Sequence, residues 1–169
     1  MNIKFENRIF IECKTDKILV FKLGFKKCVI CAGGIGEVCN KLKESINSCG
    51  LVDEDTYKRG RSPPYMENLL QNSLIRNNHD IKIAYDKKRN NYLIVLCPDH
   101  ETWIIQTARV LGISLRNYKL PDNINRFKII TLANPNKVEK LLEDILAKSH
   151  PRVNELKNAF KLCELVLSK

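Results

Sequence analysis

Three short apolar runs separated by helical patterns fill the first fifty residues, and they constrain the fold more than any other feature. The runs cover residues 9–11, 28–31 and 49–52, and each is too short and too apolar to leave one face in water. Residues 35–46 place apolar side chains at spacings of three and four, which is typical of an amphipathic helix. The order strand, helix, strand, helix, strand predicts an α/β fold: a compact, Rossmann-like, mostly parallel sheet with helices on both faces.

The rest of the sequence adds strands and then becomes helical. Residues 65–75 predict a helix, and 81–97 predict two strands around a polar turn. The second of these strands, 92–97, is the most apolar stretch of the chain and should be central. One helix should follow Pro98, and two more helical patterns begin at about residue 135. We therefore expect an α/β domain over residues 1–113 and a helical C-terminal extension over residues 114–169 that packs on it.

The charge of the chain favours an anionic partner. Lys and Arg number 29 against 19 Asp and Glu, which gives a formal net charge of +10, and nucleic acid is the commonest partner of such proteins. The seven cysteines are scattered and several lie in apolar runs, as buried reduced thiols do. No apolar stretch approaches the roughly 20 residues that span a membrane, and the first ten residues lack the layout of a signal peptide. These features predict a cytoplasmic protein with no membrane partner.

Acidic residues follow several of the predicted strands. Glu12 follows the first strand, Asp53 and Asp55 follow the third, and Glu101 lies just beyond the long strand. Because the carboxyl ends of parallel strands line one edge of a sheet, these acids should gather there. Two carboxylates at about 4 Å repel by roughly 4 kcal/mol at an effective dielectric near 20, so converging acids take up protons or bind a cation. Oxygen ligands of this kind suit Mg²⁺ (or Mn²⁺). The alternative is that each acid is a solvated turn residue.

This pattern resembles the TOPRIM domain family, in particular its small nuclease-like and overcoming-lysogenization-defect-type members. That family has an acid at the end of its first strand and a D-x-D motif at the end of its third. The matching segments, which lie between residues 7 and 113, are "IFIECKTDKILV", "GLVDEDT" and "VLCPDHETWI". The family's glycine after the first acid is Cys13 in this chain.

The resemblance implies a metal-dependent phosphodiester hydrolase, a nuclease that acts on DNA or RNA. It implies that Asp53 and Asp55 bind Mg²⁺ (or Mn²⁺), and that Glu12 is the general base or a further metal ligand. Glu101 would be an additional group at the metal. The loop after the D-x-D carries three basic residues that would contact the nucleic-acid backbone, namely Lys58, Arg59 and Arg61.

Two other interpretations remain open at this point. The first is a non-catalytic TOPRIM-like module that binds nucleic acid or nucleotide, which the Cys13 departure favours. The second is a response-regulator receiver, which would also need a Thr or Ser after its fourth strand and a Lys after a fifth. Gly33, Gly34 and Gly36 either bring backbone N–H groups to a phosphate or form a tight strand-to-helix turn.

Overall fold

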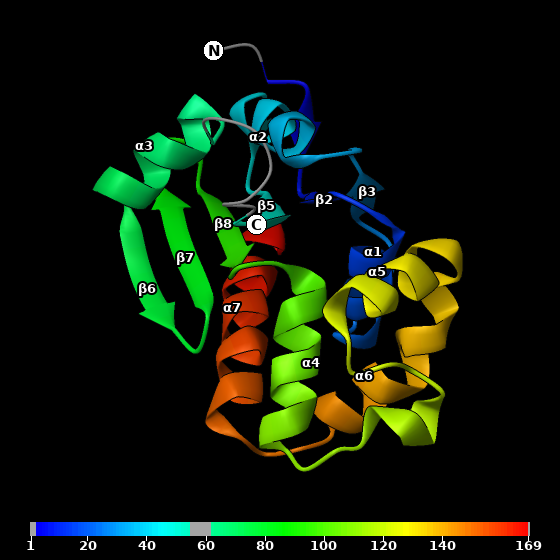
Figure 1. The fold of residues 1–169 in the computed structure, drawn as a ribbon. Coiled ribbons are helices and arrows are strands. Elements are labelled where there is room, and N and C mark those ends of the chain that lie inside the picture. Colours follow the sequence, from blue (N-terminus) through cyan, green and yellow to red (C-terminus); the bar gives the residue numbers. More distant parts are fainter. Residues whose placement is uncertain (1–2, 55–61, 169) are drawn as a thin grey trace.

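The computed structural model describes residues 3–54 and 62–168 and shows an α/β fold with a helical C-terminal region (Figure 1). The strands are β1 (Phe5–Glu6), β2 (Ile9–Ile11), β3 (Val29–Cys31), β4 (Ser45–Ile46), β5 (Cys49–Asp53), β6 (Leu74–Asn78), β7 (Ile81–Asp86) and β8 (Asn91–Leu96). The α-helices are α1 (Lys14–Lys22), α2 (Ile35–Lys43), α3 (Pro64–Asn72), α4 (His100–Val110), α5 (Ile124–Ala133), α6 (Glu139–Leu146) and α7 (Pro151–Leu167). Two 3₁₀ helices cover Leu115–Tyr118 and Pro135–Val138. Over the described ranges, no helix has the length and apolar character needed to cross a membrane.

Six strands form one mostly parallel sheet in the order β3-β2-β5-β8-β7-β6. The first four are mutually parallel, whereas β7 is antiparallel to both of its neighbours. β8 lies between β5 and β7, which confirms the prediction that 92–97 is central. The remaining strands, β1 and β4, form a separate parallel pair. The four parallel strands therefore end along the same edge of the sheet.

Helices cover both faces of the sheet, and the alternation of buried side chains along β2 shows how. Ile9 and Ile11 belong to a buried cluster formed with α1, α4, α5, α6 and α7. Phe10, between them, belongs to a second cluster formed with α2 and α3. In Figure 1, α2 and α3 lie together in the upper part of the view, and α4 and α7 run side by side in the lower part. A strand buried on both faces needs apolar residues at every position, which explains the unbroken apolar runs of the sequence.

The C-terminal helices share a core with the sheet. The larger cluster combines strand residues with Val153, Leu156 and Phe160 of α7. Arg152, at the start of α7, is buried and donates from Nε to Thr107 Oγ1 of α4 at 2.7 Å. Its guanidinium also pairs at 2.6 Å with Asp80, in the turn between β6 and β7, and lies over the ring of buried Trp103 of α4. α7 is therefore held both to α4 and to that turn.

Several elements differ from the sequence prediction, and β1 is one that was not predicted. The helix expected over 65–75 ends at Asn72, and β6 begins at Leu74. β6 is an edge strand with every residue exposed, so it lacks the apolar alternation that predicts strands. Likewise, the helix expected over 35–46 ends at Lys43, because Ser45 and Ile46 pair with β1. α5 was not predicted.

Replacing Gly50 of β5 by Ala should destabilise the fold by about 1–3 kcal/mol through overpacking. A Cβ at this position would lie 2.6 Å from Cδ1 of Leu42 and 3.0 Å from Cγ1 of Val38, both fully buried. Gly36→Ala in α2 is the matched control, since its Cβ would meet no atom within 4 Å and should add about 0.5–1 kcal/mol. Urea denaturation measures both values. A Gly50→Ala variant as stable as the wild type would show that Leu42 and Val38 move aside at no cost.

Candidate functional site

Acidic residues from three adjacent strands meet at the carboxyl edge of the sheet. Ile11 pairs in register with Leu51, and Asp53 pairs with Leu96, so the ends of β2, β5 and β8 lie close to one another. Glu12 follows β2, Asp53 is the last residue of β5, and α4 begins shortly after β8. The parallel order of the strands thus brings together residues that are about 40 positions apart in the sequence.

Asp53 connects the neighbouring elements at this edge. Its backbone N–H donates to Oε1 of Glu12 at 2.6 Å. Its side-chain Oδ1 accepts from the backbone N–H of His100, the first residue of α4, at 2.9 Å. Asp53 is therefore held to the end of β2 through its backbone N–H and to the start of α4 through its carboxyl group.

A buried acid–imidazole pair lies directly behind this carboxyl group. Nδ1 of His100 is 2.7 Å from Oδ1 of Asp16, and the two side chains are almost fully buried. The other oxygen of Asp16 accepts from the N–H of Cys13 at 3.0 Å, which caps the start of α1. Nε2 of His100 has no hydrogen-bond partner among the described residues. The pair joins the first turns of α1 and α4.

Burial and neighbouring charges shift the pKa values of the site. Burial, together with the charges of Asp16, Glu12 and Glu101, raises the pKa of Asp53 to about 8 against the opposing effect of His100. Burial alone would lower the pKa of His100, but its hydrogen bond to Asp16 and the nearby carboxylates outweigh this and raise it to about 9. Near pH 7 the site therefore contains a protonated Asp53 beside a positively charged His100 that is hydrogen-bonded to Asp16.

Two further groups complete the edge on α4. Glu101 lies in the first turn and is 8% exposed, so its charge acts on Asp53 and His100 at short range. Asp99 accepts from the N–H of Thr102 at 2.8 Å as the helix cap. Its other oxygen accepts from Nζ of Lys128 of α5 at 2.7 Å. Lys128 lies in residues 114–169, where the sequence showed no motif, so only the fold reveals its place here.

The D-x-D motif and the basic loop are described only in part. Asp53 and Glu54 lie within the described residues, and Glu54 pairs with Lys82 of β7. Asp55 and the three basic residues predicted to contact nucleic acid lie outside the described residues, namely Lys58, Arg59 and Arg61.

The glycine turn after β3 lies beside Glu12. The N–H of Gly33 donates to the backbone oxygen of Glu12 at 3.2 Å, and its φ of 101° is one that L side chains rarely adopt. Gly34 then precedes the first turn of α2. The glycines therefore form a tight strand-to-helix turn at the same edge of the sheet.

The described residues fit a cation that is bound by few protein ligands. Within 3–54 and 62–168, no group of three or more His, Cys, Asp or Glu side chains is placed to bind a metal ion. Mg²⁺ is usually held by one or two carboxylates, with water and substrate phosphates in the other positions. Burial is the main cause of the raised pKa of Asp53, and the charges of Asp16, Glu12 and Glu101, which add to it, are ones that such an ion would offset. Asp53 and Glu12 are neighbours at this edge, joined by the hydrogen bond from the Asp53 N–H to Glu12 Oε1, and Asp55 lies outside the described residues.

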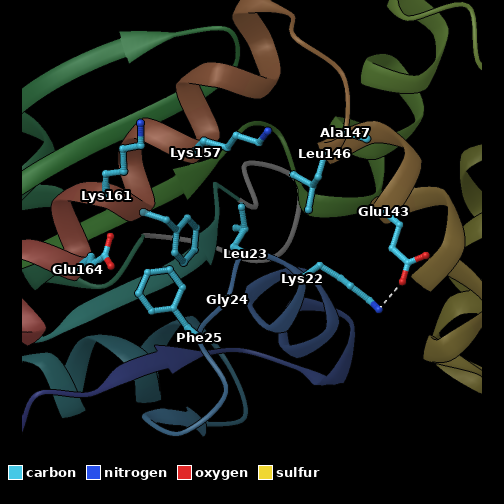
Figure 2. A pocket seen from close by; sticks show the side chains of 11 residues that line it. Lys22, Leu23, Gly24, Phe25, Glu143, Leu146, Ala147, Lys157, Lys161 and Glu164 are labelled. Carbon is cyan, nitrogen blue, oxygen red and sulfur yellow. Dashed lines mark hydrogen bonds and ion pairs between the residues drawn. The ribbon is translucent and has the colours of Figure 1, made fainter.

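A separate hollow of about 670 Å³ lies where α1 meets α6 and α7 (Figure 2). Leu23, Phe25 and Leu146 line its apolar part, and Lys157 and Lys161 of α7 lie at its border. None of the acids of the sheet edge lines it, so it is not part of the acidic site.

The chain matches no protein-family model, no curated protein and no solved structure.

Proposed function

We propose that the chain is a TOPRIM-like, metal-dependent phosphodiester hydrolase, a nuclease that acts on nucleic acid. The observation that carries the proposal is the buried Asp53 carboxyl group near Glu12, Asp16 and Glu101, whose charges add to burial in raising its pKa to about 8. A site that holds this many acids in a chain of net charge +10 is suited to a divalent cation that a phosphate also contacts.

Each residue has a distinct role in this proposal. Asp53 and Asp55 would hold Mg²⁺ or Mn²⁺, with Glu101 as an additional group beside it. The bound ion supplies Lewis-acid chemistry, because it polarises a phosphoryl oxygen and offsets the charge that develops there. Glu12 is the proposed general base that takes the proton of the attacking water.

The groups around these acids position them and the substrate. Asp16 fixes the imidazole ring of His100, and the backbone N–H of His100 fixes the Asp53 carboxyl group. Lys58, Arg59 and Arg61 follow the D-x-D directly in sequence and would contact the nucleic-acid backbone.

A non-catalytic binding module is the alternative function. It is favoured by the lack of a three-ligand group within the described residues and by Cys13 in place of the glycine of the resembled motif. The two functions differ in how they depend on metal. A nuclease needs the ion for turnover, whereas a binding module retains nucleic acid in the presence of a chelator.

Calorimetric titration with Mn²⁺ tests the metal site. We expect the wild type to bind the ion and the double variant Asp53→Asn/Asp55→Asn to show no binding heat, because both carboxylates are removed with little change in volume. Asp122→Asn, an exposed acid after α4, is the control and should bind as the wild type does. Equal binding by the wild type and the double variant would contradict the proposed metal site.

A further inference from the structure

A groove of about 880 Å³ runs along α1, between that helix and the 3₁₀ segment Pro135–Val138. None of the acids of the site lines it. We infer that this groove binds single-stranded nucleic acid and leads the strand to the carboxyl edge of the sheet. The inference rests on the proposed function, because it names the form of nucleic acid that the acidic site would receive.

The groove carries an excess of uncompensated positive charge. Four lysines line it, and one of them, Lys22, is neutralised by Glu139 and Glu143 at 2.6 Å each. Lys14, Lys17 and Lys26 form no ion pair with any other described residue, and all three are exposed. Glu139 is the only acid in the lining formed by described residues, and it already pairs with Lys22. Three ammonium groups are thus available to successive phosphates.

Between these lysines, the floor of the groove is apolar and partly aromatic. Ile18 and Phe21 line it and are half-buried, so part of each side chain faces the groove. The ammonium group of Lys17 lies 5.3 Å from the centre of the Phe21 ring. When a phosphate draws Lys17 away from the ring face that it covers, an unpaired base can stack on that face while its phosphate is neutralised.

The groove reaches the acidic site at one end. Lys14 is the first residue of α1 and follows Glu12 by two positions. Cys31, which also lines the groove, pairs in register with Ile11 at the end of β2. A strand that lies on Lys14 therefore arrives at the ends of β2 and β3, next to the proposed general base.

At its other end the groove meets the hollow of Figure 2. Both are lined by Lys22 and Gly24, so they are adjacent along the end of α1. Lys157 and Lys161 border that hollow and form no ion pair with other described residues. Glu164 also lines that hollow, so its positive charge is weaker than that of the groove along α1.

The apolar side chains at the floor of the groove favour single-stranded over double-stranded nucleic acid as its ligand. In a duplex the base faces are stacked on one another, so only phosphates, sugars and base edges meet a protein surface. Phe21 and Ile18 would then contact no base face. A single strand presents base faces and phosphates together, so its bases can pack on the apolar floor while its phosphates contact the lysines.

Binding of a fluorescein-labelled oligonucleotide of twenty thymidines, measured by anisotropy in EDTA, tests the groove apart from any cleavage. Lys14→Ala/Lys17→Ala should weaken binding and lower the slope of log K against log [salt] by about 1.4, since each contact with a single strand contributes about 0.7. Phe21→Leu keeps an apolar side chain and should weaken binding roughly 5- to 150-fold by loss of base stacking. Lys87→Ala/Lys88→Ala is the matched control, because these exposed lysines lie between β7 and β8, at the opposite edge of the sheet.

Two results would overturn the inference. Equal weakening by the control pair would show that only total charge matters. A duplex of the same length that binds as tightly as the single strand would show that the floor does not receive bases. Failure of the proposed function gives a different result: no Mn²⁺ binding and no cleavage, with groove-dependent binding of the oligonucleotide intact.

Discussion

Replacing Glu12 by Gln should lower the rate of metal-dependent cleavage by about 10²- to 10⁴-fold, the usual contribution of a general base. The amide oxygen of Gln can still accept the N–H of Asp53, which donates to Glu12 at 2.6 Å, so the edge of the sheet should keep its geometry. The measurement is single-turnover cleavage of labelled single-stranded DNA and RNA in Mn²⁺, with binding in EDTA as the check that the substrate is still held.

The control for this experiment is Glu6→Gln, which makes the same chemical change at an exposed residue of β1. It should cleave as the wild type does. A Glu12→Gln variant that cleaves within about threefold of the wild type would contradict the general-base role. A variant that loses Mn²⁺ binding together with cleavage would instead assign Glu12 to the metal.

Asp53→Asn should make the metal-free protein more stable near pH 7, by about 2–4 kcal/mol. The reason is that burial raises the pKa of Asp53 from 3.8 to about 8 in the folded chain. Between these pH values the folded state binds one proton more than the unfolded state, so stability falls as pH rises, by up to about 1.4 kcal/mol per unit. Asn resembles the protonated acid and does not titrate.

Urea denaturation of both proteins at pH 4.5, 6 and 7.5, in EDTA, measures this effect. The difference between variant and wild type should be small at pH 4.5 and grow with pH. His100, whose pKa is raised to about 9, also loses stabilisation as pH rises, but it is present in both proteins and contributes mainly a common background. Asp122→Asn should give a difference that is near zero at every pH. If the difference in the free energy of unfolding between Asp53→Asn and the wild type were the same at all three pH values, the pKa of Asp53 would not be raised in the folded chain.

The parallel part of the sheet and two of its acids could be predicted because each depends on local sequence. An apolar run that ends in Glu12 or Asp53 marks both a buried strand and its carboxyl end, and parallel order then brings those ends together. The pair formed by Asp16 and His100 could not be predicted in this way. The two residues are 84 positions apart, and they meet only because β2, β5 and β8 are adjacent and place the starts of α1 and α4 side by side.

The elements that the sequence did not predict are those held by pairing or by distant contacts. β6 has every residue exposed and is defined by its hydrogen bonds to β7. β4 consists of two residues that would equally well continue α2. α5 has no clear apolar stripe, since Ile129 and Leu132 are each 67% exposed while Phe127 is fully buried. Neither apolar periodicity nor end signals identify such segments.

The core shared by the sheet and α7 has a consequence for the order in which the chain acquires structure during synthesis. Every strand leaves the ribosome before α7 does, yet Val153, Leu156 and Phe160 belong to the same buried cluster as the central strands. One face of the nascent sheet therefore remains without part of its cover until the last helix emerges. An uncovered apolar sheet face is the kind of surface that chaperones bind, so folding of this chain is completed after translation of its strands rather than alongside it.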